Sequence, residues 1–441
     1  MRVMSWIRER LREGTNLQRL AGNSGWLFFD WVFRSVLGFV VGIWLARHLG
    51  PTDFGTFNYA IAFVSLFTAV ATLGLDAVVI RDLARDTAGK DVILGSAFGL
   101  RLAGALLSVI AAAGCVALLK PGNTPILLLV AVIAAGGLFQ SFDVVDFWFQ
   151  SQVKSKYAVI ARAVAATIAA AARIALIALG AALLAFAVTV SAELAIVAAG
   201  LIVAYHIQGN RIGTWRFSRS TAAALLSDSW PLILSGLALY IQARIDQVML
   251  GEMLGDAEVG QYSVAMRLIE TFSFAPMIIY SSVAPTVAQA KLEGENVYLE
   301  RLTNIYRLMF IIFVLTALPI YIFSDTIVRL LYGDAYRQAG VLLSLFALRP
   351  LFANFGVARS LFITNENMFK HALMAAITGC LVNVGLNYWL IPLYRSAGAI
   401  IATMFSFLVT VFLFDLLSAR ARVNLRIMIR AMLTPWRLRV S

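Results

Sequence analysis

The sequence predicts an all-α polytopic membrane protein of about twelve transmembrane helices, and two observations lead to this fold class. Apolar residues make up 61% of the 441 residues and charged residues only 14%, whereas soluble globular proteins have roughly 45–50% and 25%. The apolar runs also recur at even spacing from residue 24 to residue 420. A chain of this composition has too little polar surface to cover itself in water.

A membrane-spanning helix needs about 20 mostly apolar residues. We expect spans at residues 24–47, 56–80, 92–118, 125–149, 157–180, 182–205, 229–251, 259–288, 303–323, 339–363, 369–393 and 397–418. The fifth and sixth spans form one long Ala-rich stretch, which we divide at Gly180 because a hairpin there keeps the count even. In residues 1–23, Val3, Ile7 and Leu11 recur at helical spacing among five arginines, which predicts an amphipathic segment on the membrane surface.

The basic residues predict the orientation of these spans, because lysine and arginine gather in cytoplasmic loops. The N-terminus, the C-terminal tail and the loops on their side together hold 22 lysines and arginines. The loops on the other side hold five: Arg47, Lys120, Arg329, Arg337 and Arg395. We therefore expect both termini to be cytoplasmic, with residues 419–441 forming a basic cytoplasmic tail.

A short internal repeat divides the chain into halves. Residues 49–60 read LGPTDFGTFNYA and residues 254–265 read LGDAEVGQYSVA, so two glycines and three other positions recur 205 residues later. Each copy falls between the first and second span of a six-helix set. We expect two six-helix bundles, residues 24–205 and 229–418, joined by a cytoplasmic linker at 206–228 and related by a pseudo-twofold axis along the membrane normal.

Five motifs resemble those of the lipid-linked oligosaccharide flippases, which form the polysaccharide biosynthesis branch of the multidrug/oligosaccharidyl-lipid/polysaccharide exporter superfamily. They are LARHLGPTDFGTFNYA from residue 45, LGLDAVVIRDLARD from residue 73, DFWFQSQVKSKYAVIARAV from residue 146, DQVMLGEMLGDAEVGQYSVAMRL from residue 246 and LLYGDAYRQAG from residue 330. Each pattern is loose alone, and their order on twelve spans gives them specificity.

The resemblance implies a flippase in the bacterial inner membrane that works by alternating access. Its cargo would be a polyprenyl-diphosphate-linked glycan, such as a precursor of O-antigen lipopolysaccharide, carried from the cytoplasmic to the outer leaflet. A gradient of H⁺ or Na⁺ would drive it, and the polysaccharide polymerase machinery would be a partner. We expect no cofactor, no metal site and no nucleic-acid partner.

Ionisable residues deep in a span cost several kcal/mol and normally face a protein interior or an aqueous cavity. Six arginines lie at such depth and are our candidates for binding the diphosphate and glycan: Arg34, Arg101, Arg173, Arg244, Arg267 and Arg349. A guanidinium keeps its proton and can bind phosphate oxygens through two parallel hydrogen bonds. The spacing leaves an alternative for Arg34 and Arg267, because Asp30 and Glu270 are near enough along the helix to neutralise them.

Three embedded acids are candidates for cation coupling. Asp246 and Glu270 are the first choices because they lie near Arg244 and Arg267, and Asp30 is the third. A carboxylate that exchanges an arginine partner for a proton or Na⁺ could couple transport to a gradient, although simple counter-ions would show the same pattern.

Three other embedded charges receive non-functional interpretations. Asp143 and Asp146 share a helical face and resemble a metal pair, but with no third ligand in view we favour capping and interfacial hydration. We expect Arg162, near a span end, to reach the interface.

Two alternatives to the flippase remain. A drug/cation antiporter of the same superfamily would need an acidic cavity, which six arginines disfavour. A membrane-embedded glycan transferase or ligase would need a catalytic loop, whereas the longest outer loop here, at 324–338, holds about 15 residues and no catalytic motif.

Overall fold

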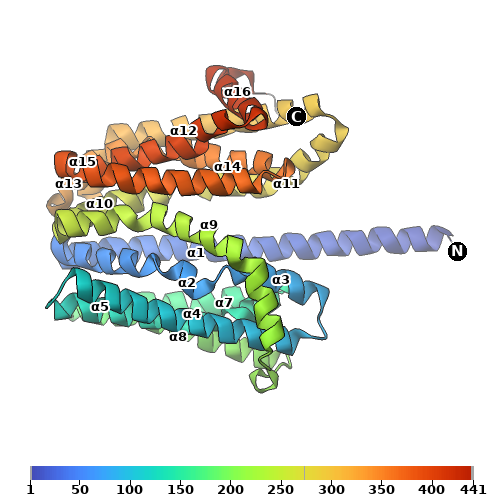
Figure 1. Ribbon diagram of the computed structural model, residues 1–441, viewed down its shortest axis with the longest axis horizontal. Coiled ribbons are helices and arrows are strands. Elements are labelled where there is room, and N and C mark those ends of the chain that lie inside the picture. Colours follow the sequence, from blue (N-terminus) through green and yellow to red (C-terminus); the bar gives the residue numbers. More distant parts are fainter. Residues whose placement is uncertain (1, 273, 439–441) are drawn as a thin grey trace. The chain divides into compact units, whose positions relative to one another are not determined.

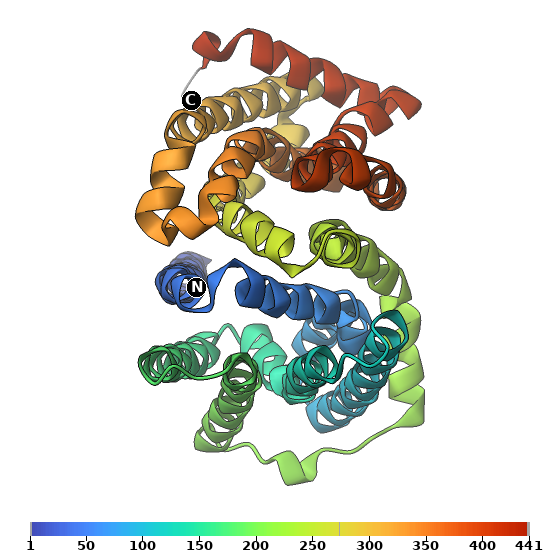
Figure 2. The same cartoon turned by 90° about the vertical axis from the view of Figure 1, so that its left-hand side faces the viewer.

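The computed structural model describes residues 2–272 and 274–438. The side chains of residues 2–21, 24, 274, 275, 278 and 281 lie outside this description, and with them the predicted apolar stripe of Val3, Ile7 and Leu11. All regular secondary structure in the described part is helical, as predicted (Figure 1). The helices form two compact units, residues 1–48 with 63–237 and residues 49–62 with 238–441, in which the long helices run side by side (Figure 2).

The first unit is built from α1 and the helices that follow it as far as the first part of α9. The bounds are α1 Arg2–Ser65, α2 Thr68–Thr72, α3 Leu75–Arg85, α4 Lys90–Leu119, α5 Thr124–Gly136, η1 Phe139–Asp143, α6 Val144–Ser151, α7 Lys156–Ala178, α8 Leu183–Ile207, η2 Ile212–Thr214 and α9 Arg219–Met253. Its core gathers apolar side chains of α3, α4, α6, α7 and α8.

The second unit takes a short piece of α1, the rest of α9 and all later helices. The bounds are α10 Asp256–Glu270, α11 Phe274–Glu293, α12 Glu295–Tyr332, η3 Asp334–Tyr336, α13 Arg337–Phe346, α14 Arg349–Asn365, α15 Phe369–Val411, η4 Leu413–Leu417, α16 Ala419–Leu433 and η5 Pro435–Arg437. Helix α12 packs against α13, α14, α11 and α16 and so lies at the centre of this unit.

Within the described residues, eight helices are long and apolar enough to cross a membrane, or nine if the bent pair α13 and α14 counts as one span. The last of the eight runs over 49 residues. If straight, it would be about 74 Å long at 1.5 Å per residue, more than twice the thickness of a bilayer core. It breaks at Arg395, whose φ of 54° and ψ of −140° are not helical. The expected eleventh and twelfth spans therefore share α15.

Four expected spans are interrupted rather than continuous: 125–149 is divided over α5, η1 and α6, 339–363 over α13 and α14, and the other two are as follows. The span at 56–80 is divided over the end of α1, α2 and α3, with Leu73 and Gly74 in left-handed conformations between α2 and α3. The span at 259–288 is divided over α10 and α11. The hairpin predicted at Gly180 is confirmed, because α7 ends at Ala178, α8 begins at Leu183 and Gly180 has a φ of 64°.

The two copies of the repeat meet inside the second unit. Gly50 (φ 72°, ψ 174°) and Gly255 (φ 94°, ψ 173°) have nearly the same conformation, and each precedes a helical segment that contains the second glycine of its copy. A Cβ on Gly55 would lie 1.7 Å from the carbonyl oxygen of Asp256, and one on Gly260 would lie 2.0 Å from that of Pro51. Because Asp256 and Gly260 are the repeat counterparts of Pro51 and Gly55, the contact has local twofold symmetry.

This close crossing predicts that either glycine cannot be replaced by alanine without cost. We expect Gly260→Ala, and equally Gly55→Ala, to destabilise the protein by about 1–3 kcal/mol, because the added methyl group meets backbone that cannot move aside. Thermal unfolding of the purified protein in detergent measures this. Gly114→Ala in α4 is the control, because a Cβ there would have nothing within 4 Å. A melting temperature of Gly260→Ala or Gly55→Ala equal to that of Gly114→Ala would contradict the close contact of the two helices.

Candidate functional site

A chain of ion pairs crosses the first unit from α1 to α6. The carboxylate of Asp30 accepts hydrogen bonds from Arg34 Nε at 3.0 Å and from Arg162 Nε at 2.9 Å. Arg162 Nη1 donates to Asp146 Oδ2 at 2.7 Å, and Gln150 donates to the same oxygen at 3.0 Å. Arg162 therefore forms ion pairs with two buried carboxylates, on α1 and α6. Its side chain points to these partners rather than to the interface, so that prediction was wrong.

Arg101 holds a second group of charges beside the first. Only 3% of its side chain is exposed, its Nη1 donates to Asp76 at 2.9 Å and its Nη2 to Asp143 at 3.3 Å. The guanidinium also lies over the ring of Phe147, 5.1 Å from its centre. Asp143 and Asp146 therefore serve two different arginines, which corrects their assignment to capping and interfacial hydration.

We call the seven residues Asp30, Arg34, Asp76, Arg101, Asp143, Asp146 and Arg162 the N-terminal charge network. Arg173 forms a separate pair close by, donating to Glu193 at 2.8 Å and to Thr189 at 3.1 Å. Arg34, Arg101, Arg162 and Arg173 thus each have at least one carboxylate partner. An arginine that is neutralised in this way adds little positive potential to its surroundings.

A cavity of about 420 Å³ opens beside the N-terminal charge network. Its charged lining consists of two arginines, Arg34 and Arg162, and four acids, Asp76, Asp143, Asp146 and Glu193. Arg34 is the more accessible of the two arginines, with 43% of its side chain exposed. The cavity is therefore more acidic than the six-arginine prediction suggests.

In the second unit, Asp246 is buried among neutral hydrogen-bond donors. Its carboxylate accepts hydrogen bonds from Tyr262 at 2.6 Å, from the Asn387 amide at 2.6 Å and from the hydroxyl of Thr403. Asn383 joins the group by donating to Thr403 at 3.2 Å. We call these five residues, which come from α9, α10 and α15, the Asp246 cluster. Within the described residues Asp246 pairs with no arginine, so the counter-ion interpretation fails for it.

The Asp246 cluster has the chemistry of a hard-cation site. Sodium and similar ions prefer oxygen ligands, and the cluster contains the Asp246 carboxylate, the Thr403 hydroxyl and the side-chain carbonyl groups of Asn383 and Asn387. The side-chain oxygen of Asn387 is buried and accepts no hydrogen bond within the described residues. A buried acceptor of this kind costs free energy unless a proton donor or cation satisfies it.

Three further predicted residues meet around Glu270. Arg244 Nη1 lies 3.9 Å and Arg349 Nη2 3.6 Å from Glu270 Oε1. Both separations exceed those of a good charge-assisted hydrogen bond, and Arg349 Nη1 is buried without a hydrogen-bond partner in the described part of the chain. Arg267 is half-buried on α10, three residues before Glu270. We call Arg244, Glu270 and Arg349 the Glu270 triad, in which two cations share one carboxylate.

Sequence reasoning missed most partners of these sites. The asparagines of the Asp246 cluster were visible as polar residues spaced i,i+4 in an apolar span, which is a usable signal. A buried ion pair of Arg359 with Asp415, at 3.1 Å from Nε, was missed altogether. His371 contacts the same carboxylate at 2.9 Å, so this group joins α14 and α15 to η4 and serves packing.

Comparison with protein families places the chain beside membrane exporters. The family model described as polysaccharide biosynthesis protein matches residues 20–291, and a second model, MatE, matches residues 231–389. A curated protein of Haloferax volcanii, named "Probable low-salt glycan biosynthesis flippase Agl15", is 24% identical over 193 residues. The matched region is 44% of this chain and 41% of that relative, so the chain matches less than half of the relative's length.

Solved structures of similar fold are flippases and transporters. The lipid II flippase MurJ in an inward closed conformation has a TM-score of 0.73 at 14% identity, over 94% of this chain and 91% of that one. An inward-facing multidrug resistance MATE family transporter of the MOP superfamily has a TM-score of 0.72 at 17% identity, over 90% and 96%. A MOP superfamily transporter from Pyrococcus furiosus scores 0.61 at 16% identity, over 93% and 96%. At these identities the likeness is one of fold.

Proposed function

We propose, from the premise that this chain belongs to the polysaccharide biosynthesis protein family, that it is a flippase for a polyprenyl-diphosphate-linked oligosaccharide. The chain is a multi-pass membrane protein whose structural relatives transport rather than catalyse. The cargo would move from the cytoplasmic to the outer leaflet by alternating access, as a glycan precursor of a surface polysaccharide such as O-antigen lipopolysaccharide.

The observation that best supports this cargo is the Glu270 triad. Two arginines against one carboxylate leave an excess positive charge, and both ion-pair distances are long enough for another anion to compete. A diphosphate offers several oxygens at concentrated negative charge, and each guanidinium can bind two of them in parallel. Arg349 Nη1, which has no hydrogen-bond partner among the described residues, could donate to such an oxygen.

The other predicted arginines divide into two roles. Arg101 and Arg173 are held by carboxylates of their own unit, and we assign them to packing of the first unit. Arg34 is partly exposed at the cavity, and Arg267 lies one helical turn from Glu270. We propose that Arg34 and Arg267 contact the diphosphate or glycan at another stage of transport.

We further propose that the Asp246 cluster binds the coupling cation, H⁺ or Na⁺. A cation at the carboxylate would satisfy the buried oxygen of Asn387 and neutralise Asp246, which removes the cost of a buried charge. Glu270 would act differently, as the counter-ion that the incoming diphosphate displaces. Asp30, which serves Arg34 and Arg162, fits a structural role in the first unit.

Orientation and organisation complete the proposal. The loops and termini on one side hold 22 basic residues against five on the other, and by the positive-inside rule this supports cytoplasmic termini. The membrane would be the bacterial inner membrane. Residues 24–205 and 229–418 would be the two bundles, with 206–228 as linker and 419–441 as tail. The polysaccharide polymerase machinery would receive the product.

One observation favours a second function, export of cationic compounds. The cavity of the first unit is lined by four acids and two arginines, which suits a cationic ligand better than a diphosphate. Drug-resistance assays with cationic dyes separate the two functions. Dye efflux that survives loss of Arg244 and Arg349 would favour the antiporter.

Replacing either arginine of the triad should stop glycan export. We expect Arg244→Ala and Arg349→Ala each to lower export at least tenfold, since each removes a charge-assisted bond of about 1.5–3 kcal/mol to the diphosphate. Surface glycan in a deletion strain, at matched protein levels, is the measurement. Arg329→Ala is the control, because Arg329 is exposed and pairs with Asp325 one turn away. Full export by both triad variants would exclude the proposed role.

Removing the charge of Asp246 should uncouple transport from the cation. We expect Asp246→Asn to abolish stimulation by a Na⁺ or H⁺ gradient in proteoliposomes, because the amide neither binds a proton nor attracts Na⁺ as a carboxylate does. Asp325→Asn, a change on the exposed side of α12, should keep the stimulation. Gradient-dependent transport by Asp246→Asn would rule out coupling at this cluster.

A further inference from the structure

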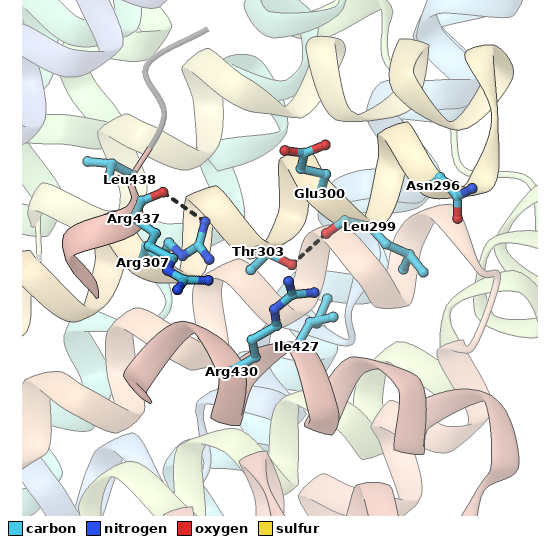
Figure 3. A pocket seen from close by; sticks show the side chains of 9 residues that line it. All are labelled: Asn296, Leu299, Glu300, Thr303, Arg307, Ile427, Arg430, Arg437 and Leu438. Atoms are coloured by element: carbon cyan, nitrogen blue, oxygen red, sulfur yellow. Dashed lines mark hydrogen bonds between the residues drawn. The ribbon is translucent and has the colours of Figure 1, made fainter. Parts of the chain in front are cut away.

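A second cavity, of about 740 Å³, lies in the second unit between the start of α12 and the C-terminal segment (Figure 3). Its charged lining consists of Arg307, Arg430, Arg437 and the single acid Glu300, so positive charge exceeds negative by two. Asn296 and Thr303 add polar groups from α12. None of these residues belongs to the sites described above.

One wall of this cavity is held by hydrogen bonds of Arg307, which is only 7% exposed. Its Nη1 donates to Asn304 at 2.8 Å and to the carbonyl oxygen of Arg437 at 3.0 Å, and its Nη2 donates to Thr434 at 3.0 Å. Figure 3 shows the bond to Arg437 closing one end of the cavity. These bonds fix the turn that follows α16 to α12. The cavity is therefore part of the folded unit rather than a gap under a loose tail.

The other two arginines are available to a ligand. Arg430 and Arg437 are both exposed, and in the part of the chain that the structure describes neither forms an ion pair. In Figure 3 the guanidinium of Arg430 extends from α16 toward Thr303. Two guanidinium groups at a polar cavity favour an anion with several oxygens, such as a phosphate.

Exposed apolar side chains on the same C-terminal segment indicate what kind of molecule carries that phosphate. Ile429 and Leu433 are spaced i,i+4 on α16 and Trp436 follows in η5, and Leu433 and Trp436 are 66% and 76% exposed. Ile429 and Leu433 lie among Arg422, Arg426 and Arg430 on the exposed face of α16. An exposed surface that mixes arginines with large apolar residues is typical of the membrane interface, where tryptophan is enriched. The cavity would then face the layer of lipid headgroups.

We propose that this cavity binds the phosphate headgroup of an anionic phospholipid from the adjoining leaflet. Arg430 and Arg437 contact the phosphate oxygens, Thr303 and Asn296 bond the polar end of the headgroup, and Ile429, Leu433 and Trp436 pack along the acyl chains. Bound there, the lipid holds α16 and the C-terminal turn against α12. This site is separate from the Glu270 triad and does not depend on the nature of the cargo.

Native mass spectrometry of the full-length protein with phosphatidylglycerol or phosphatidylcholine tests the proposal. We expect one phosphatidylglycerol to remain bound, and Arg430→Gln with Arg437→Gln to weaken it at least tenfold, because both charged donors to the phosphate are lost. Arg422→Gln with Arg426→Gln is the matched control, since it removes two exposed arginines of α16 that do not line the cavity. Thermal unfolding of both variants checks that they fold.

The source of the phosphate is tested in the same experiment. Competition by inorganic phosphate, or by a short-chain prenyl diphosphate, at concentrations that displace phosphatidylglycerol would overturn the phospholipid assignment in favour of that ligand. Equal weakening by the cavity variant and the control variant would also overturn the proposal, because it would reduce the binding to diffuse attraction by the basic tail. Retention of phosphatidylglycerol by the cavity variant would do the same.

Discussion

The free-energy cost of an ionised group in the interior of a membrane protein is the constraint on which this structure depends. Such a group costs several kcal/mol unless an opposite charge or hydrogen bonds compensate it. In the first unit, Arg34, Arg101, Arg162 and Arg173 each find a carboxylate on a helix of the same unit. The pairs therefore fix the packing of α4 against α3 and η1, and of α7 against α1, α6 and α8, as much as they neutralise charge.

The second unit departs from this neutralisation of arginines by nearby acids at two points. The Glu270 triad has one acid for two arginines, and in the described part of the chain the acid of the Asp246 cluster pairs with no arginine. An excess of positive charge and an isolated carboxylate both need a further ion to become neutral. The proposed function supplies one ion for each, a diphosphate and a cation, and so accounts for both departures together.

The sequence was sufficient to predict what depends on neighbours along the chain. Hydropathy located the helices, Gly180 located a hairpin, and the repeated glycines marked equivalent positions of two helices. The i,i+4 spacing also found the pair of Asp30 with Arg34. Breaks inside helices were less visible, because Leu73 and Arg395 carry no residue-type signal for a left-handed or otherwise non-helical backbone.

What depends on contacts between helices could not be predicted. Arg101 meets Asp76 and Asp143, which are 25 and 42 residues away, and no spacing rule connects positions on separate helices. For the same reason the two ion pairs of Arg162 and the approach of Arg349 to Glu270 were not predicted. The acids that line the cavity of the first unit beside Arg34 come from four separate elements, and no spacing rule brought them together with that arginine.

Binding of a water-soluble short-chain prenyl diphosphate to the purified Glu270→Gln variant tests the central claim most directly. If the two arginines of the Glu270 triad bind the diphosphate, removal of the competing carboxylate should tighten binding of the prenyl diphosphate roughly tenfold, a change of about 1.4 kcal/mol. Glu193→Gln, which unpairs Arg173 in the first unit, should leave the affinity unchanged. Unchanged or weaker binding by Glu270→Gln would contradict the account.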